Sequence, residues 1–233
     1  MDVAPPSPPR LASPPSRWDD GLFQGFRATF GTALRLWFRL RVEGQLPAGP
    51  CVLAANHTSF LDPLVLGAAQ PRRIVYLMTE VVWRSPAFGW FYRWSRAIPL
   101  RTRGGNRDAL RAARAVLQQG RVVGIFPEGG LSRDGRLMVG SPGAVSLALQ
   151  AGVPIVPVGI VGAHAAMPPG AVWPRPRRIR VCFGAPIAPA ELEALGGDDR
   201  RQRLQVATTA LMRRIAHLTG GVAREDELAT ASR

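Results

Sequence analysis

A histidine and an aspartate lie five positions apart in "AANHTSFLDP", residues 54–63. His57 directly follows a short apolar run, and Asp62 lies where Pro63 and the next apolar run open a helix. A chain that turns between them can bring the carboxylate to one imidazole nitrogen, which fixes the tautomer and leaves the other nitrogen free to take a proton. The pair is a candidate catalytic base, although a histidine in a polar loop is more often structural or exposed.

A glycine-rich segment, "GIFPEGGLSRDG" at residues 124–135, is the second candidate. It also follows an apolar run, so Glu128 and Gly129 are expected at the same sheet edge as the histidine. Adjacent glycines let backbone N–H groups approach an anion, and Ser132 and Arg133 add a donor and a positive charge. The Gly-Lys-Ser/Thr ending of a nucleotide P-loop is absent. The alternative is a glycine-rich surface turn.

Two more segments could shape the same site. In "AIPLRTRGGNRDA", residues 97–109, Arg101 and Arg103 stand between a strand and a helix, where arginines suit a phosphate. "AGVPIVPVGIVG", residues 151–162, reads as an apolar strand in which Pro157 is the second proline. It offers no ionisable group, so we expect it to form a wall of the site.

The other histidines and the two cysteines are interpreted mainly as structural. His164 follows the apolar strand and could edge the site, whereas His217 lies among arginines in the last helical pattern. Cys51 and Cys182 both stand inside apolar runs, which is typical of buried, reduced cysteines rather than of a disulfide or metal pair. Reduced cysteines favour a cytoplasmic setting.

Short apolar runs rich in β-branched residues alternate with helical patterns along the chain. This alternation predicts a single α/β domain with a mostly parallel, mixed sheet flanked by helices. In such a sheet ligands bind at the carboxyl ends of the strands, where the segments above begin. The strands are expected at 51–55, 73–77, 97–100, 121–126, 153–160 and 179–183, and the helices at 60–69, 84–95, 106–119, 142–151 and 199–219.

The ends of the chain differ from its middle. Residues 1–17 form a Pro/Ser-rich tail that is expected to be disordered, and residues 221–233 form a loose tail after the main domain at 43–220. Residues 18–42 predict an amphipathic helix, which either lies in a membrane interface or caps the core of the domain. Its apolar face is expected to hold Leu22, Phe26, Phe30, Ala33 and Trp37, with its arginines largely off that face.

Charge and hydropathy narrow the classes of partner. The 233 residues carry a formal charge of +14, all thirty basic residues are arginine, and such a surface attracts anionic lipids, phosphates or nucleic acid. The arginines are spread along the chain, so no nucleic-acid partner is expected. No apolar run approaches the ~20 residues that cross a bilayer. The aromatic segment 81–94 is either core or a membrane or acyl-chain contact.

In this order the four segments resemble the blocks of the glycerolphosphate/lysophosphatidic acid (1-acyl-glycerol-3-phosphate) acyltransferase superfamily. Its blocks read N-H-x-x-x-x-D, G-x-I-x-x-x-R, F-P-E-G-T-R-S and V-P-[IV]-[VI]-P-V, and the resemblance spans about residues 45–165. It implies that His57 deprotonates the acceptor hydroxyl and that Asp62 orients and charges the histidine. The hydroxyl would attack the thioester of an acyl-CoA or acyl-carrier protein, with no metal or cofactor.

The resemblance also implies a set of substrate-binding residues, with two departures from the family pattern. Gly130 and Leu131 replace the threonine and arginine of the third block, so the usual phosphate-facing arginine is missing. In the second block either Arg101 or Arg103 could be the family arginine, and Arg103 is preferred because glycines follow it. The implied substrate-binding residues are Asn56, Ser59, Arg101, Arg103, Glu128, Gly129, Gly130, Ser132, Arg133 and Pro157.

The expected protein is a peripheral or monotopic acyltransferase on the cytoplasmic face of the cell membrane. It would move a fatty acyl group to the free hydroxyl of a lysophospholipid, with 1-acyl-glycerol-3-phosphate as the leading acceptor and phosphatidic acid as product. The altered third block leaves open another acceptor, such as a lyso-ornithine lipid. A non-catalytic lipid-binding protein of the same fold and a thioesterase are the remaining alternatives.

Overall fold

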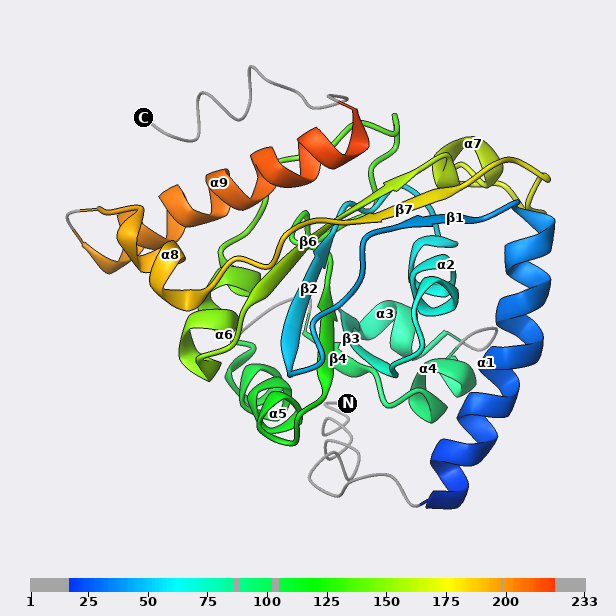
Figure 1. Ribbon diagram of the computed structural model, residues 1–233, viewed down its shortest axis with the longest axis horizontal. Coiled ribbons are helices and arrows are strands. Elements are labelled where there is room, and N and C mark those ends of the chain that lie inside the picture. Colours follow the sequence, from blue (N-terminus) through cyan, green and yellow to red (C-terminus); the bar gives the residue numbers. More distant parts are fainter. Residues whose placement is uncertain (1–16, 86–88, 102–104, 198, 221–233) are drawn as a thin grey trace, which may run out of the picture.

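The computed structural model describes residues 17–85, 89–101, 105–197 and 199–220. Its centre is a seven-stranded sheet in the order β1-β7-β6-β2-β5-β3-β4 (Figure 1). All neighbouring strands are parallel except β6 and β7, which are antiparallel, so the predicted mostly parallel, mixed sheet is confirmed. The strands are β1 (Arg41–Glu43), β2 (Cys51–Ala55), β3 (Ile74–Thr79), β4 (Ile98–Leu100), β5 (Val122–Ile125), β6 (Ile155–Val161) and β7 (Arg180–Phe183).

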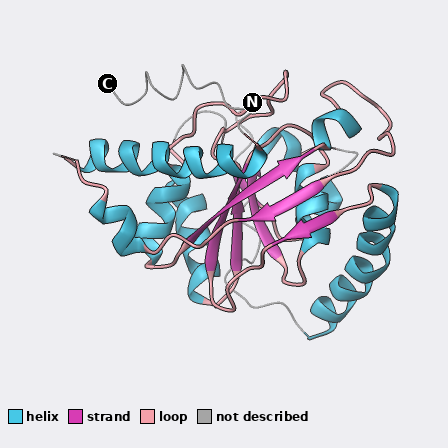
Figure 2. Cartoon of the chain, turned by 45° about the horizontal axis from the view of Figure 1, so that its top comes forward, coloured by secondary structure: helices cyan, strands magenta, loops and turns pink. Residues whose placement is uncertain are grey.

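Helices cover both faces of the sheet (Figure 2). In β2, Val52 and Ala54 face the layer that contains α5, α6, α8 and α9, whereas Leu53 and Ala55 face the layer with α2 and α7. This alternation follows from the period of two along a strand, and burial on both sides requires the unbroken apolar run. The helices are α1 (Arg17–Trp37), α2 (Asp62–Ala69), α3 (Glu80–Trp83), α4 (Gly89–Trp94), α5 (Arg107–Gln118), α6 (Gly143–Ala151), α7 (Ala163–Ala166), α8 (Pro189–Ala194) and α9 (Arg200–Thr219).

Helix α1 differs from its prediction in length and in orientation. It ends at Trp37, not at residue 42, because Arg41–Glu43 form the edge strand β1. The residues of its predicted apolar face do not share one environment: the Phe26 ring packs against rings of α4, whereas Trp37 is 54% exposed. Arg35, predicted off the packed face, instead donates to the carbonyls of Ala68 and Ala69 at the end of α2. A cation suits that helix end.

Other elements refine the predicted ones. The helix expected at 84–95 is present in part as α4, the short helix α3 precedes that range, and residues 86–88 lie outside the described residues. The tails predicted at 1–17 and 221–233 also lie outside them, apart from Arg17. Cys51 and Cys182 are buried and neither forms a disulfide, as predicted. Within the described ranges, none of the helices combines the length and the apolar character that crossing a membrane requires.

Candidate active site

The predicted contact between His57 and Asp62 is present at the carboxyl end of β2. His57 Nδ1 lies 2.9 Å from Asp62 Oδ2, which also accepts the backbone N–H groups of Thr58 (2.6 Å) and Ser59 (2.8 Å). The Asp62 side chain is fully buried and that of His57 is 19% exposed. Burial raises the pKa of the Asp62 carboxyl, while His57 and the two N–H donors oppose that rise. With Nδ1 on the carboxylate, Nε2 is the nitrogen that remains to take a proton.

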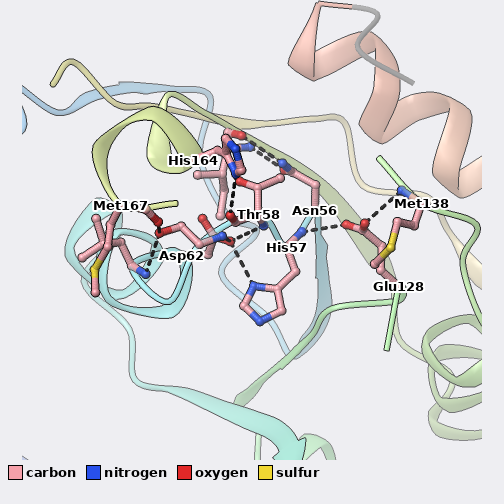
Figure 3. A network of polar contacts seen from close by, with 11 residues as sticks. Asn56, His57, Thr58, Asp62, Glu128, Met138, His164 and Met167 are labelled. Carbon is pink, nitrogen blue, oxygen red and sulfur yellow. Dashed lines mark hydrogen bonds and ion pairs between the residues drawn. The ribbon is translucent and has the colours of Figure 1, made fainter. Parts of the chain in front are cut away.

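Glu128 holds the backbone of His57 from the neighbouring strand end (Figure 3). Its Oε1 accepts the His57 N–H at 2.7 Å, and its Oε2 accepts the Met138 N–H at 2.9 Å. Burial raises the pKa of Glu128 to about 7, opposed by these same two N–H donors. The prediction that Glu128 and His57 share one sheet edge is confirmed. Both carboxylate oxygens are engaged by the protein's own backbone, so the contacts of Glu128 are those of a positioning residue; its substrate-binding role stays a prediction.

The third block supports His57 at two further points. The Ser132 N–H donates to the His57 carbonyl at 2.8 Å, and the Phe126 ring stacks on the imidazole with centroids 4.1 Å apart. Sequence reasoning missed Phe126, although its position in the Phe-Pro-Glu-Gly run was the available signal. Asp62 therefore holds the imidazole edge, Phe126 its face, and Glu128 and Ser132 its main chain.

An apolar cavity of about 290 Å³ opens beside His57. Gly129 and Gly130 form part of its lining, and Gly129 has φ +68°, a left-handed conformation that favours glycine. Leu131, which stands in the place of the family arginine, also lines the cavity. The described lining contains no arginine; its other residues are Phe60, Pro63, Tyr76, Leu77, Met78, Thr79, Val82, Tyr92, Leu100, Ile125 and Phe126.

The arginines predicted to bind phosphate lie elsewhere or outside the described residues. Arg101 is exposed after β4, and its backbone N–H donates to the Asn106 side chain at 2.7 Å. Arg133 is exposed as well, and Arg103 falls in the undescribed 102–104. The structure therefore does not bring Arg101 or Arg133 into the lining of the cavity, and their role in substrate binding remains a prediction.

Three other predicted substrate residues make contacts within the protein. The Asn56 amide is buried and pairs with the backbone of Ile160 on β6, donating at 2.9 Å and accepting at 2.7 Å. Ser59 Oγ donates to the carbonyl of Met167 at 2.7 Å. Ser132 Oγ donates to the Asp134 carboxylate at 3.0 Å. These contacts brace the loop around His57.

Pro157 and His164 complete the surroundings of that loop. Pro157 lies on β6 opposite Ala54 of β2, and it is not in the described lining of the His57 cavity, so its substrate-binding role stays a prediction. His164 Nδ1 lies 3.2 Å from the Thr58 carbonyl, so this histidine does reach the edge of the site. It lines a separate cavity of about 240 Å³ that shares none of its described lining with the His57 cavity.

Comparisons with known proteins identify a family and several relatives of this chain. A family model described as "Acyltransferase" matches residues 39–161, more than half of the chain. The chain is 30% identical over 164 residues to the chloroplastic 1-acyl-sn-glycerol-3-phosphate acyltransferase of Brassica napus, covering 64% of this chain and 47% of that protein. It is 32% identical over 124 residues to the lyso-ornithine lipid O-acyltransferase of Pseudomonas aeruginosa, covering 53% and 47%. The chain thus spans about half the length of these curated relatives.

The same fold is found among solved structures. The crystal structure of the 1-acyl-sn-glycerophosphate acyltransferase of Thermotoga maritima aligns with a TM-score of 0.68 and 22% identity, covering 90% of this chain and 85% of that one. The alignment extends beyond the matched family segment, so the shared architecture includes much of the sheet and its flanking helices.

Proposed function

This chain belongs to the acyltransferase family, and from that premise we propose that it transfers a fatty acyl group from a thioester donor to the free hydroxyl of a lysophospholipid. The observation that carries the proposal is the buried His57–Asp62 pair beside an apolar cavity. The pair supplies a base for a hydroxyl, and the cavity suits the hydrocarbon part of a lipid substrate.

In the proposed reaction His57 Nε2 takes the proton of the acceptor hydroxyl as its oxygen attacks the thioester carbonyl carbon. The new C–O bond forms, the tetrahedral intermediate collapses, and the C–S bond breaks. The proton on the imidazolium then passes to the leaving thiolate of CoA or acyl-carrier protein. The Asp62 carboxylate stabilises the positive ring and keeps Nδ1 as the donor. No metal or cofactor takes part in this scheme.

The acyl chain is proposed to occupy the apolar cavity. A second, smaller cavity of about 60 Å³ lies under α1 and shares Pro63, Tyr76 and Tyr92 with the first. Phe91 and Tyr92, from the aromatic segment at 81–94, border it. The two cavities together give apolar surface from His57 toward α1, which supports a long-chain substrate.

The leading acceptor is 1-acyl-glycerol-3-phosphate, which the name of the Brassica relative supports. A lyso-ornithine lipid is the second candidate, because Leu131 replaces the family arginine and the described cavity lining holds no arginine. The Pseudomonas relative is named for that acceptor. The cytoplasmic face of the membrane is the proposed location, with α1 and the arginine-rich surface in contact with lipid.

An acceptor screen tests the proposed function. Purified protein is mixed with acyl-CoA or acyl-carrier protein and one lyso-lipid at a time, and thiol release and acylated lipid are both measured. Thiol release that requires the acceptor supports acyl transfer. Equal release without acceptor would indicate a thioesterase, and no release with any donor and acceptor would favour a non-catalytic lipid-binding protein.

A further inference from the structure

Residues 167–178, which lie between α7 and β7, form a closed loop tied to the catalytic edge of the sheet; we refer to it as the α7–β7 loop. Its base is closed by the Arg175 N–H, which donates to the Ala166 carbonyl at 2.7 Å. The Met167 carbonyl accepts the Ser59 hydroxyl, two residues from His57. One hydrogen bond therefore closes the foot of the α7–β7 loop, and another connects it to the loop that carries His57.

The tip of the α7–β7 loop exposes large apolar side chains. Val172 is 79% exposed and Trp173 is 82% exposed, and prolines follow at 174 and 176. Exposed aromatic and aliphatic groups on a braced loop indicate a surface that is covered in use. Tryptophan in particular suits the boundary between lipid and water.

The charge beside this tip is uniformly positive. Arg175, Arg177 and Arg178 are all exposed, and residues 135–190 contain no aspartate or glutamate. None of these three arginines is in the ion pairs of the described chain. Arginines that flank an exposed tryptophan complement a surface of anionic headgroups.

The loop lies at the same end of the sheet as the cavity. β7 runs antiparallel to β6, so the loop that joins them lies where β6 ends, as does the His57 loop after the parallel strand β2. The Ile179 N–H donates to the Phe38 carbonyl at 3.0 Å, which places the loop's end against the end of α1. Leu36 and Trp37, 75% and 54% exposed, extend the apolar surface there.

We propose that the α7–β7 loop is a membrane-docking element that inserts Val172 and Trp173 into an anionic lipid surface and thereby presents the catalytic edge to the bilayer. Arg175, Arg177 and Arg178 contact the headgroup phosphates. That docking serves catalysis rests on the proposed function with its lipid substrate, whereas vesicle binding is measured separately from activity. This surface is distinct from the outer face of α1 near its start, where Trp18 is 85% exposed.

Vesicle flotation of the full chain tests this proposal. Vesicles of phosphatidylcholine with phosphatidylglycerol are compared with vesicles of phosphatidylcholine alone. Trp173→Ala should weaken binding to the mixed vesicles about tenfold through loss of a buried apolar side chain. Replacing the three arginines by glutamine should weaken it roughly 100-fold on mixed vesicles. Leu195→Ala, an exposed leucine after α8, is the matched control and should bind as wild type does.

The contrary outcomes are separable. If Trp173→Ala binds mixed vesicles as tightly as wild type, the docking role of the loop is overturned. The same holds if Trp18→Ala weakens binding while Trp173→Ala leaves it as in wild type, because α1 alone would then dock the chain. Trp173→Ala should keep turnover of a short-chain, water-dispersed lyso-lipid, which excludes unfolding. Failure of the proposed function would instead leave vesicle binding intact and turnover absent in wild type.

Discussion

Two charged clusters lie at opposite edges of the sheet, and they differ in the groups that neutralise them. At the carboxyl ends of β2 and β5, Asp62 is held by an imidazole and by two backbone N–H groups. At the start of β3, Arg73 contacts Asp19 and Asp20 of α1 at 3.4 and 3.3 Å, and Arg96 contacts Asp19 at 2.9 Å. In its effect on the aspartate pKa, burial outweighs the contacts in the first cluster, whereas hydrogen bonds and ion pairs together outweigh burial in the second.

The pKa shifts of the two aspartates follow this difference. Burial raises the pKa of Asp62. Burial also acts to raise that of Asp19, but its hydrogen bonds and ion pairs with Arg73 and Arg96 outweigh burial and lower it. The His57 ring borders a cavity, whereas the Phe23 ring covers Arg73, with its centroid 4.0 Å from the guanidinium carbon Cζ. The comparison indicates that the first cluster keeps one nitrogen accessible for chemistry, while the second fastens a helix.

The largest expected effect is in the first cluster. Asp62→Asn keeps an oxygen for the backbone N–H groups but removes the negative charge that stabilises a protonated His57. We expect turnover to fall by about 10²–10⁴-fold with the fold retained. Steady-state kinetics and circular dichroism on the same preparation measure both. Turnover equal to wild type would mean that the charge of Asp62 has no part in the reaction.

The next effect concerns Glu128, which joins the third block to His57. Glu128→Gln retains one acceptor oxygen and loses the other, so the His57 main chain is held less tightly. Turnover should fall by about 10–100-fold through misplacement of the base. Leu131→Ala, a nearby cavity residue without a contact to the His57 backbone, serves as the comparison. An unchanged Glu128→Gln enzyme would remove the positioning role.

Glu128 also gives the free energy of unfolding a pH dependence. Its pKa is raised from an ordinary 4.5 to about 7, so between these values the folded protein holds a proton that the unfolded chain releases. This contribution to stability is complete below pH 4.5 and is lost as the pH rises toward 7. Urea unfolding across this window should show the loss in wild type and a weaker slope in Glu128→Gln. Identical slopes would contradict it.

The smallest effect on activity is expected in the second cluster. Asp19→Asn leaves the nearly buried Arg73 with one carboxylate and should lower the free energy of unfolding by about 1–3 kcal/mol. Turnover of a water-dispersed acceptor should stay as in wild type, because the cluster lies at the edge of the sheet opposite to the His57 site. Denaturant unfolding measures the loss of stability, and the kinetic assay measures whether turnover is unchanged. A large loss of turnover in folded protein would erase the contrast between the clusters.

The sequence pattern predicted the sheet well because its buried strands are unbroken apolar runs. β1 was missed, since a three-residue edge strand with two charged side chains carries no such signal. Helices α7 and α8 have four and six residues, too few for a helical period to show. The spacing of His57 and Asp62 allowed their contact, and the resemblance to the acyltransferase blocks made it the expected one. The support from Glu128 could not, because backbone N–H donors leave no mark on the sequence.

The central claim is that His57 is the base for an acceptor hydroxyl, and one assay tests it directly. Thiol release from acyl-CoA is followed with and without the lyso-lipid identified in the screen, for wild type, His57→Ala and the matched control His217→Ala, an exposed histidine of α9. We predict acceptor-dependent release by wild type and His217→Ala. In folded His57→Ala the rate of this release should fall by about 10²–10⁴-fold. Acceptor-dependent release by His57→Ala at the wild-type rate would contradict the account.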